Sequence, residues 1–308
     1  MASGNSVNVA VVGAGSIGSR HQRILKQLGH KVSVVSANSP DADFRSMSDA
    51  LERESFDYVV IASQTSQHVI DLSALINNRF NGRVLIEKPL FEKLHTLEEN
   101  SFSFAAVGYN LRFHPAIVWL KDTLPKLGKL TSANFYVGQF LPTWRPDSDY
   151  RKSSSARDIS GGGVLRDLSH ELDLVQYLFG DWQQLTAVGG KFSDLEIATD
   201  DTFSILMTST KCNAISVQLN YVDRIKQRYI TINGNHGTVS IDLISNTAKF
   251  SDLDVKFSVN ADDTYVAQHL AVISNDSQNT CSLSEALKVV ETIQAIEKSA
   301  EKLKWINQ

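Results

Sequence analysis

Three short segments of the sequence carry residue types that can take part in chemistry. The first is the glycine-rich run GAGSIG at 13–18, which directly follows the apolar run at 7–12. The second is Glu87-Lys88-Pro89, and the third is GGGVLRDLSHELDLVQYLFG at 161–180. The first pattern is typical of phosphate binding, whereas the other two hold side chains that exchange protons near neutral pH.

The run at 13–18 matches the GxGxxG pattern of dinucleotide-binding folds. Its first glycine permits a tight turn, the second lets the backbone approach a pyrophosphate, and the third lets the helix pack closely on the strand. The preceding strand and following helix are the context that this pattern requires. We predict a dinucleotide site here, although a glycine-rich structural turn is the alternative. The predicted contacts are Gly13, Gly15, Ser16, Ile17 and Gly18.

The choice between NAD and NADP depends on the end of the second predicted strand, 31–36. An acidic residue there binds the adenosine ribose hydroxyls of NAD and repels the 2′-phosphate of NADP. This chain has Ser36, Ala37 and Asn38 instead, and no arginine adjoins them in the sequence. NADP is therefore slightly favoured, and NAD remains open because Ser36 or Asn38 is able to bind its ribose hydroxyls.

Two groups are candidates for proton transfer. Lys88 follows the fourth predicted strand, 83–87, where burial and neighbouring cations lower a lysine pKa toward neutrality. Asp167, His170 and Asp173 are spaced by three on a helix predicted at about 167–179, so a carboxylate is able to orient the imidazole. The alternatives are a surface lysine and a polar helix face with a core histidine. The spacing fits neither a nucleophilic triad nor a metal site.

The pattern of predicted secondary structure, which positions these segments, changes near residue 120. Before it, strands alternate with helices, which predicts an α/β Rossmann domain at 1–115 with a parallel sheet. After it, strands joined by turns predict an α+β domain at 116–308 with a large, mostly antiparallel open sheet. The expected strands are 7–12, 31–36, 57–62, 83–87, 102–107, 129–140, 185–192, 202–209, 214–221, 228–233 and 238–243, with helices at 17–28, 66–78, 167–179 and 284–300.

Composition excludes several classes of protein. The 308 residues are 42% hydrophobic and carry a net charge of −4, which argues against binding to nucleic acid or to an anionic membrane. No apolar run approaches the roughly 20 residues that span a bilayer, and the first residues lack the features of a signal peptide. The cysteines, Cys212 and Cys281, have no metal-type spacing. A reducing cytoplasm is expected.

The motifs taken together resemble the Gfo/Idh/MocA oxidoreductases, the relatives of glucose–fructose oxidoreductase and inositol dehydrogenase. The likeness includes GAGSIGSRH, His68, EKP, GYNLRFHP at 108–115, the run at 161–180, and Gly234 with the Gly-Thr pair at 237–238. It implies hydride transfer between a nicotinamide and a sugar-type carbinol carbon. It also implies a second domain whose open sheet carries the substrate pocket and the interface of a homodimer or homotetramer.

By this resemblance, Lys88 is the proton-transfer lysine with a cis bond to Pro89, His170 is the catalytic histidine, and Asp167 or Asp173 is its acidic neighbour. The acid precedes His170 by three residues instead of the usual four. This DLSHE-type feature resembles a subgroup found among surface-sugar biosynthesis enzymes. Further implied cofactor contacts are Ser36, Asn38, Ser63, Gln64, His68, Glu87 and Lys88, and implied substrate contacts are Asn110, Arg112, Trp144, Arg145, Tyr150 and Arg151.

The leading hypothesis is an NAD(P)-dependent sugar oxidoreductase. Cations crowd the segments expected near the substrate, which indicates an anionic sugar such as a nucleotide sugar or sugar acid; a solvated charged surface is the alternative. A non-catalytic cofactor-binding regulator or scaffold, and an NAD-dependent glycoside hydrolase, are the competing functions. The cations are Arg145, Arg151, Lys152, Arg157, Arg166, Arg224, Lys226 and Arg228.

Overall fold

The computed structural model describes residues 6–157 and 161–308, and the chain divides into two compact units. The first unit comprises the residues up to 110 together with 261–287, and the second comprises 111–260 with 288–308. The sequence predicts a single division after residue 115. The structure instead packs 261–287, which that division assigns to the second domain, into the first unit.

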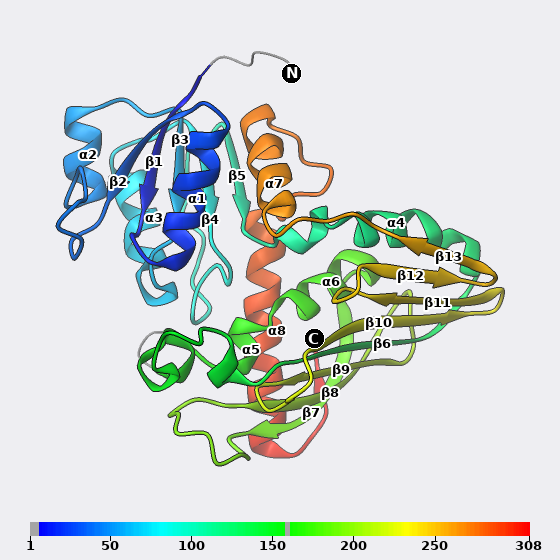
Figure 1. Ribbon diagram of the computed structural model, residues 1–308. Helices are drawn as coiled ribbons and strands as arrows, with labels where there is room; N and C mark the ends of the chain where they lie inside the picture. Colours follow the sequence, from blue (N-terminus) through cyan, green and yellow to red (C-terminus); the bar gives the residue numbers. More distant parts are fainter. Residues whose placement is uncertain (1–5, 158–160) are drawn as a thin grey trace. The chain divides into compact units, whose positions relative to one another are not determined.

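The first unit is built on a five-stranded, wholly parallel sheet in the order β2-β1-β3-β4-β5 (Figure 1). Its strands are β1 (Asn8–Val12), β2 (Lys31–Val35), β3 (Tyr58–Ile61), β4 (Arg83–Ile86) and β5 (Phe104–Val107). Its helices are α1 (Ser16–Gln27), α2 (Met47–Arg53), α3 (His68–Asn77) and α7 (Asp263–Ser274). The Rossmann-type α/β prediction is thereby confirmed.

The strands of this sheet are mostly apolar and largely buried, as is typical of a parallel sheet covered on both faces. Val9, Val11, Val60 and Leu85 have no exposed surface and form its core together with Tyr58. Since all five strands are parallel, their carboxyl ends lie at one edge. The strand order reverses between β1 and β3, the point at which open α/β sheets bind ligands.

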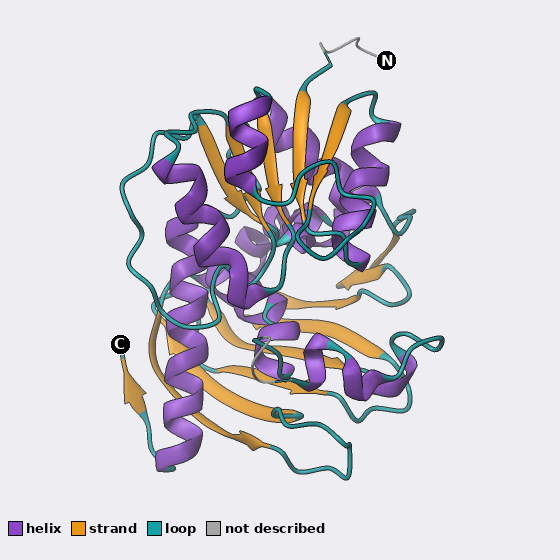
Figure 2. Cartoon of the chain, turned by 90° about the vertical axis from the view of Figure 1, so that its left-hand side faces the viewer, coloured by secondary structure: helices purple, strands orange, loops and turns teal. Residues whose placement is uncertain are grey.

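The second unit contains a nine-stranded sheet in the order β13-β12-β11-β10-β6-β9-β8-β7-β14 (Figures 1 and 2). Only β6 and β9 pair in parallel, so the predicted, mostly antiparallel open sheet is confirmed. The strands are β6 (Leu130–Gly138), β7 (Trp182–Gly190), β8 (Thr202–Ser209), β9 (Ile215–Asn220), β10 (Gln227–Gly234), β11 (Gly237–Asp242), β12 (Thr247–Phe250), β13 (Leu253–Lys256) and β14 (Ile306–Asn307).

The helices of the second unit lie against one face of this sheet, and buried side chains alternate with exposed ones along its strands. In β8, Phe203, Ile205 and Met207 are buried whereas Ser204 and Leu206 between them are exposed, the period of two that a half-buried strand requires. The helices are α4 (Pro115–Thr123), α5 (Val164–Asp167), α6 (His170–Phe179) and, from Lys288 onward, α8 (Leu283–Lys302).

Short 3-10 turns connect several of these elements: η1 (Thr65–Gln67), η2 (Asn110–Phe113), η3 (Leu124–Leu127), η4 (Leu141–Thr143), η5 (Tyr150–Lys152) and η6 (Ser154–Ala156). None of the helices in residues 6–157 and 161–308 is long and apolar enough to cross a membrane.

Candidate active site

The three glycines of the predicted cradle each have the geometry that phosphate binding requires. Gly13 has a φ of +110°, and a Cβ atom there would collide with the carbonyl oxygen of Ala62. A Cβ atom at Gly18 would collide with the carbonyl oxygen of Gly13, so the glycine lets α1 pack against the end of β1. Around Gly15 there is open space within 4 Å.

The N-terminus of α1 is also electrostatically suited to an anion. Gly15 is the N-cap residue and provides no side-chain hydrogen bond, and the first turn contains no acidic residue. The first amide groups of a helix have no acceptor within it, and the helix dipole favours negative charge at this end. These residues fit the pyrophosphate of a dinucleotide.

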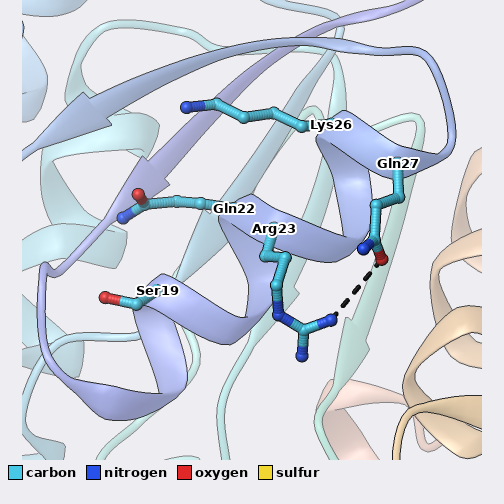
Figure 3. Close-up of a pocket in the computed structure, with 5 residues that line it drawn as sticks. All are labelled: Ser19, Gln22, Arg23, Lys26 and Gln27. Carbon is cyan, nitrogen blue, oxygen red and sulfur yellow. Dashed lines mark hydrogen bonds between the residues drawn. The ribbon is translucent and has the colours of Figure 1, made fainter.

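A shallow pocket on the outer surface of α1 is a different feature. Its lining residues recur at helical spacing on one solvated face, and Arg23 donates a 3.5 Å hydrogen bond to Gln27 within it (Figure 3). We assign no ligand to this pocket, which is lined by Ser19, Gln22, Arg23, Lys26 and Gln27.

Beyond β2, the structure adds an arginine that the sequence pattern does not reveal. The amide of Ser36 donates to the carbonyl oxygen of Phe44 at 2.9 Å, which brings the following residue, Arg45, alongside the loop after β2. Arg45 Nη1 donates to the carbonyl oxygen of Ser39 at 2.6 Å. Arg45 and Asn38 are exposed, so the end of β2 carries an accessible guanidinium.

Lys88 immediately follows β4, and its peptide bond to Pro89 is cis, as expected. Its side chain is half-buried. Glu87, which was expected to contact the cofactor, is only 8% exposed. One oxygen of its carboxylate accepts a 3.3 Å hydrogen bond from the Lys88 amide, and the other lies 2.9 Å from His21. Glu87 therefore contacts protein groups, a role the motif did not reveal.

His68 contacts the backbone of two loops at this edge of the sheet. Its Nε2 lies 3.2 Å from the carbonyl oxygen of Ser63, and its Nδ1 lies 3.1 Å from those of Pro89 and Leu90. Burial lowers the pKa of His68, although the carbonyl contacts act in the opposite direction. With 1% of its surface exposed, His68 positions the loops that follow β3 and β4. Of the other two predicted contacts in this region, Gln64 is exposed and Ser63 donates to Asp71 at 2.6 Å.

The helix predicted across 167–179 is interrupted. α5 ends at Asp167 and α6 begins at His170, with Leu168 and Ser169 between them. The hydroxyl of Ser169 donates to the carbonyl oxygen of Arg166 at 2.9 Å, which closes the turn at the break. Asp167 and His170 therefore lie on different helices, so the prediction of one shared helical face was wrong for Asp167, whereas His170 and Asp173 both lie on α6.

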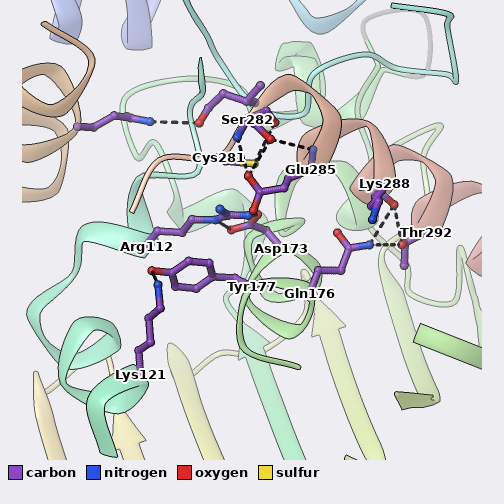
Figure 4. Close-up of polar contacts among 12 residues, drawn as sticks. Arg112, Lys121, Asp173, Gln176, Tyr177, Cys281, Ser282, Glu285, Lys288 and Thr292 are labelled. Carbon is purple, nitrogen blue, oxygen red and sulfur yellow. Dashed lines mark hydrogen bonds and ion pairs between the residues drawn. The ribbon is translucent and has the colours of Figure 1, made fainter. Parts of the chain in front are cut away.

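The acids of this segment are engaged with residues from distant parts of the second unit. The hydroxyl of Tyr221 donates to Asp167 at 2.6 Å, and Arg228 forms a bidentate pair with Glu171 at 2.7 and 2.9 Å. Asp173 is fully buried and accepts hydrogen bonds of 2.7 to 3.2 Å from Arg112 (Figure 4). Arg112, expected to bind substrate, is 1% exposed and instead holds Asp173 in place.

Gly163, the last glycine of the triplet before α5, leaves room for the buried carboxylate of Asp200. Gly163 has a φ of +110°, and a Cβ atom there would lie 2.8 Å from the Asp200 carboxylate. Asp200 accepts hydrogen bonds from the amides of Val164 and Leu165, at the start of α5. Burial raises the pKa of Asp200 to about 6 even though these amide hydrogen bonds oppose the shift.

The remaining predicted substrate contacts are distributed over both units. In the first, Asn110 is buried and donates to Thr264 at 2.8 Å. In the second, Trp144 packs edge-on against Tyr221 and is half-buried. Tyr150 accepts a hydrogen bond from the Glu196 amide, Arg151 pairs with Asp149 and Glu196, and Arg145 is exposed.

The glycine cradle at the edge of a parallel sheet defines a dinucleotide-binding domain of the Rossmann class. Residues 7–105 match the model of the oxidoreductase family with an NAD-binding Rossmann fold, and residues 125–240 match that of the GFO/IDH/MocA C-terminal domain. The chain belongs to the Gfo/Idh/MocA oxidoreductase family.

Named relatives share part of the sequence. The chain is 28% identical over 220 residues to inositol 2-dehydrogenase of Acidothermus cellulolyticus, covering 62% of this chain and 59% of that protein. It is 24% identical over 132 residues to the putative oxidoreductase YteT of Bacillus subtilis, covering 40% and 30%. The chain thus spans less than two thirds of the length of each relative.

Solved structures share the fold over nearly the whole chain. Levoglucosan dehydrogenase in complex with NADH has a TM-score of 0.85 at 17% identity, over 98% of this chain and 99% of that one. GenD2 from gentamicin A biosynthesis in complex with NAD has a TM-score of 0.80 at 21% identity, over 100% and 98%.

Proposed function

We propose that the chain is a nicotinamide-dependent oxidoreductase that moves a hydride between the cofactor and a secondary alcohol or ketone of a sugar. The observation that carries this proposal is the position of Lys88. It follows β4 at the same edge of the sheet as the glycine cradle, where open α/β sheets bind ligands. The names of the relatives, inositol 2-dehydrogenase and levoglucosan dehydrogenase, support this class of reaction.

The bound nicotinamide would supply or accept the hydride. In the oxidation direction the hydroxyl proton must also leave as the carbonyl forms, and we assign its removal to Nζ of Lys88, with His170 as the second proton carrier. In the reduction direction the same groups return the proton to the new alkoxide oxygen. Asp173 is paired with Arg112 and Asp167 accepts a hydrogen bond from Tyr221, so we keep both as candidates for the acidic neighbour of His170.

A spectroscopic screen tests the reaction class. The purified protein is mixed with NAD+ or NADP+ and a panel of cyclitols, neutral sugars, sugar acids and nucleotide sugars, and the absorbance of reduced nicotinamide is followed. We expect reduced cofactor to accumulate in step with the loss of substrate. Cleavage of a glycoside without net reduction would indicate a hydrolase, and cofactor binding without turnover of any compound would indicate a regulator.

We further propose that the cofactor is NADP(H) in preference to NAD(H). The end of β2 carries no acid at Ser36 or Asn38 to repel a 2′-phosphate, and Arg45 is exposed beside it. A guanidinium near the end of this strand is the group that accommodates that phosphate in NADP-dependent Rossmann domains.

Arg45→Ala should therefore weaken the binding of NADPH selectively. We expect its Kd for NADPH to rise about tenfold, or about 1.4 kcal/mol, with the Kd for NADH almost unchanged, in calorimetric titrations of both cofactors. Arg53→Ala is the matched control, because this exposed arginine of α2 pairs with Asp49. Equal weakening of both cofactors by Arg45→Ala, or a wild-type preference for NADH of more than about tenfold, would contradict the proposal.

An anionic sugar, such as a nucleotide sugar or sugar acid used in surface-polysaccharide synthesis, is the substrate class that we propose within this function. Fewer cations support an anionic substrate than the sequence contains, because some of them are paired with carboxylates. Arg151, Arg166 and Arg228 are held in ion pairs with carboxylates, which offsets their charge. The exposed cations of this set that remain are Arg145, Lys152, Arg157, Arg224 and Lys226.

The assembly and location of the protein are also part of the proposal. The exposed face of the nine-stranded sheet presents Val188 and Leu206 among polar side chains, which supports a homodimer or homotetramer formed through this sheet. Cys212 and Cys281 are both buried thiols that form no disulfide, as expected for a cytoplasmic protein.

A further inference from the structure

Four buried side chains of the first unit form a continuous hydrogen-bonded chain that ends beside Lys88. The hydroxyl of Tyr58 lies 2.9 Å from Nδ1 of His269, and Nε2 of His269 lies 2.9 Å from Nδ1 of His21. Nε2 of His21 lies 2.9 Å from Oε1 of Glu87. The four residues come from β3, α7, α1 and the end of β4, and the first three have no exposed surface.

The direction of this chain follows from its last member. Burial alone would raise the pKa of Glu87, but its hydrogen bond with His21 and the nearby charge of Lys88 act in the opposite direction, and that pKa is lowered. The ionised carboxylate only accepts hydrogen bonds, so the proton of the facing His21 nitrogen must be on Nε2. When the Nδ1 of His21 carries no proton, it is an acceptor and His269 donates to it from Nε2; when it does carry a proton, the direction of this contact is reversed.

The same reasoning fixes the other end of the chain. Burial lowers the pKa of His269 well below its usual value, so this ring is neutral and has a single N–H group. Once its Nε2 donates to His21, its Nδ1 accepts, and the donor is the hydroxyl of Tyr58, whose pKa is raised by burial. In this arrangement, with Nδ1 of His21 unprotonated, every contact has one donor and one acceptor, and all donors point toward Glu87.

Glu87 has little freedom to move away from this chain. Its second oxygen accepts the backbone amide of Lys88 at 3.3 Å. A Cβ atom at Gly108 would lie 2.8 Å from Oε1, so only glycine leaves room for the carboxylate there. Other titratable or charged groups that face the chain are Arg20 and Tyr265 beside His21, His30 near His269, and His68 and Lys88 near Glu87.

We propose that Tyr58 and His269 are positioning residues that act through His21 to hold Glu87 in place and ionised beside Lys88. This inference rests on the proposed function, in which Lys88 carries the proton. It assigns a role to α7, which begins 175 positions after Lys88 in the sequence but lies in the same unit of the structure.

Tyr58→Phe removes the hydroxyl that donates to His269 with little change of shape. The direction of its effect on Lys88 follows from where the remaining protons must lie. Without that donor, His269 loses its preference for carrying its proton on Nε2. When Nε2 becomes an acceptor, His21 must donate from Nδ1, and the His21–Glu87 pair takes up one proton to keep its own hydrogen bond. The net charge of the pair then changes from −1 to 0, which weakens its attraction for the ammonium form of Lys88.

The first measurement is nitrogen NMR of histidine side chains labelled with ¹⁵N, which reports tautomers without any enzymatic activity. In the wild-type protein we expect both His21 and His269 to carry their protons on Nε2. Tyr58→Phe should shift the ring nitrogen signals of both residues. A wild-type His269 protonated on Nδ1, or a Tyr58→Phe protein in which His21 is unaffected, overturns the proposed chain.

The second measurement is the pH dependence of single-turnover hydride transfer in the oxidation direction, which rises as the ammonium of Lys88 loses its proton. Glu87→Gln removes the negative charge beside Lys88, so the rising part of the pH profile should move to lower pH by about one unit or more. Tyr58→Phe should move it in the same direction by about half a unit. Tyr265→Phe is the matched control, because Tyr265 lies on α7 with its ring edge-on to His21 but is not a member of the chain. Its profile should equal that of the wild type.

The outcomes separate this inference from the proposed function. If Lys88→Met transfers hydride at the wild-type rate, the assigned role of Lys88 is wrong, whereas the NMR result still tests the hydrogen-bonded chain. If Lys88→Met is impaired and Glu87→Gln shifts the profile but Tyr58→Phe does not, Lys88 keeps its role and the positioning role of Tyr58 and His269 is refuted.

Discussion

Lys88→Met is expected to slow hydride transfer by about 10² to 10⁴, the usual cost of losing a positioned general acid or base. The hydroxyl proton of the substrate would then have no acceptor at the end of β4. Cofactor affinity should stay within about twofold of the wild-type value, a change of less than 0.5 kcal/mol by the usual conversion, because the glycines at 13–18 are untouched. Single-turnover hydride transfer and calorimetric titration of the cofactor measure the two quantities separately.

Lys93→Met is the matched control for this substitution. Lys93 is exposed and lies five positions further along the same loop, so the change removes the same charge outside the site. We expect its rate to equal that of the wild type. A Lys88→Met protein that transfers hydride from its true substrate at the wild-type rate would refute the assignment, and equal losses in both variants would point to a general effect of charge.

The first unit could be predicted well because its signals are local. Segments such as 7–12 and 57–62 are mostly apolar, which is typical of a strand buried on both faces, and the glycine pattern lies within six residues. The helix α7 was missed because its apolar face is weakly defined and the chain returns to the first unit only after the second. The buried contribution of His269 to the edge of the sheet was therefore not predicted.

In the second unit, the sequence predicted the type of sheet but not its edge. β12 and β13 are four residues each, and β13 is almost wholly exposed, so their alternation is too short and too polar to distinguish them from turns. The break between α5 and α6 was also missed. Nothing in DLSHELD distinguishes a helix that continues through Leu168 and Ser169 from one that restarts after them.

The partners of the acids in α5 and α6 could not be predicted either. Tyr221 is 54 positions from Asp167, and Arg112 is 61 positions from Asp173. Only the fold brings such residues together. Arg112 was expected to bind substrate through the resemblance of the motif at 108–115, whereas the structure buries it against Asp173.

Arg112→Leu is expected to destabilise the protein strongly, because it leaves the carboxylate of Asp173 buried without its partner. Both side chains are almost inaccessible, at 2% and 0% exposure. Breaking a buried ion pair in this way costs about 3 to 5 kcal/mol. The guanidinium also lies 4.5 Å from the centre of the Tyr177 ring, so the substitution removes a cation–π contact as well (Figure 4). Denaturant unfolding of the variant measures the loss of stability.

The double variant Arg112→Leu, Asp173→Leu shows whether the uncompensated charge causes the loss. Two apolar side chains leave no buried charge, so we expect the pair of substitutions to destabilise less than Arg112→Leu alone. Lys288→Met is the control for an exposed pair: Lys288 and Asp181 are 42% and 48% exposed, and this substitution should cost less than about 1 kcal/mol. An Arg112→Leu protein as stable as the wild type would mean that this arginine does not hold α6 in place, and its assignment to substrate binding would stand again.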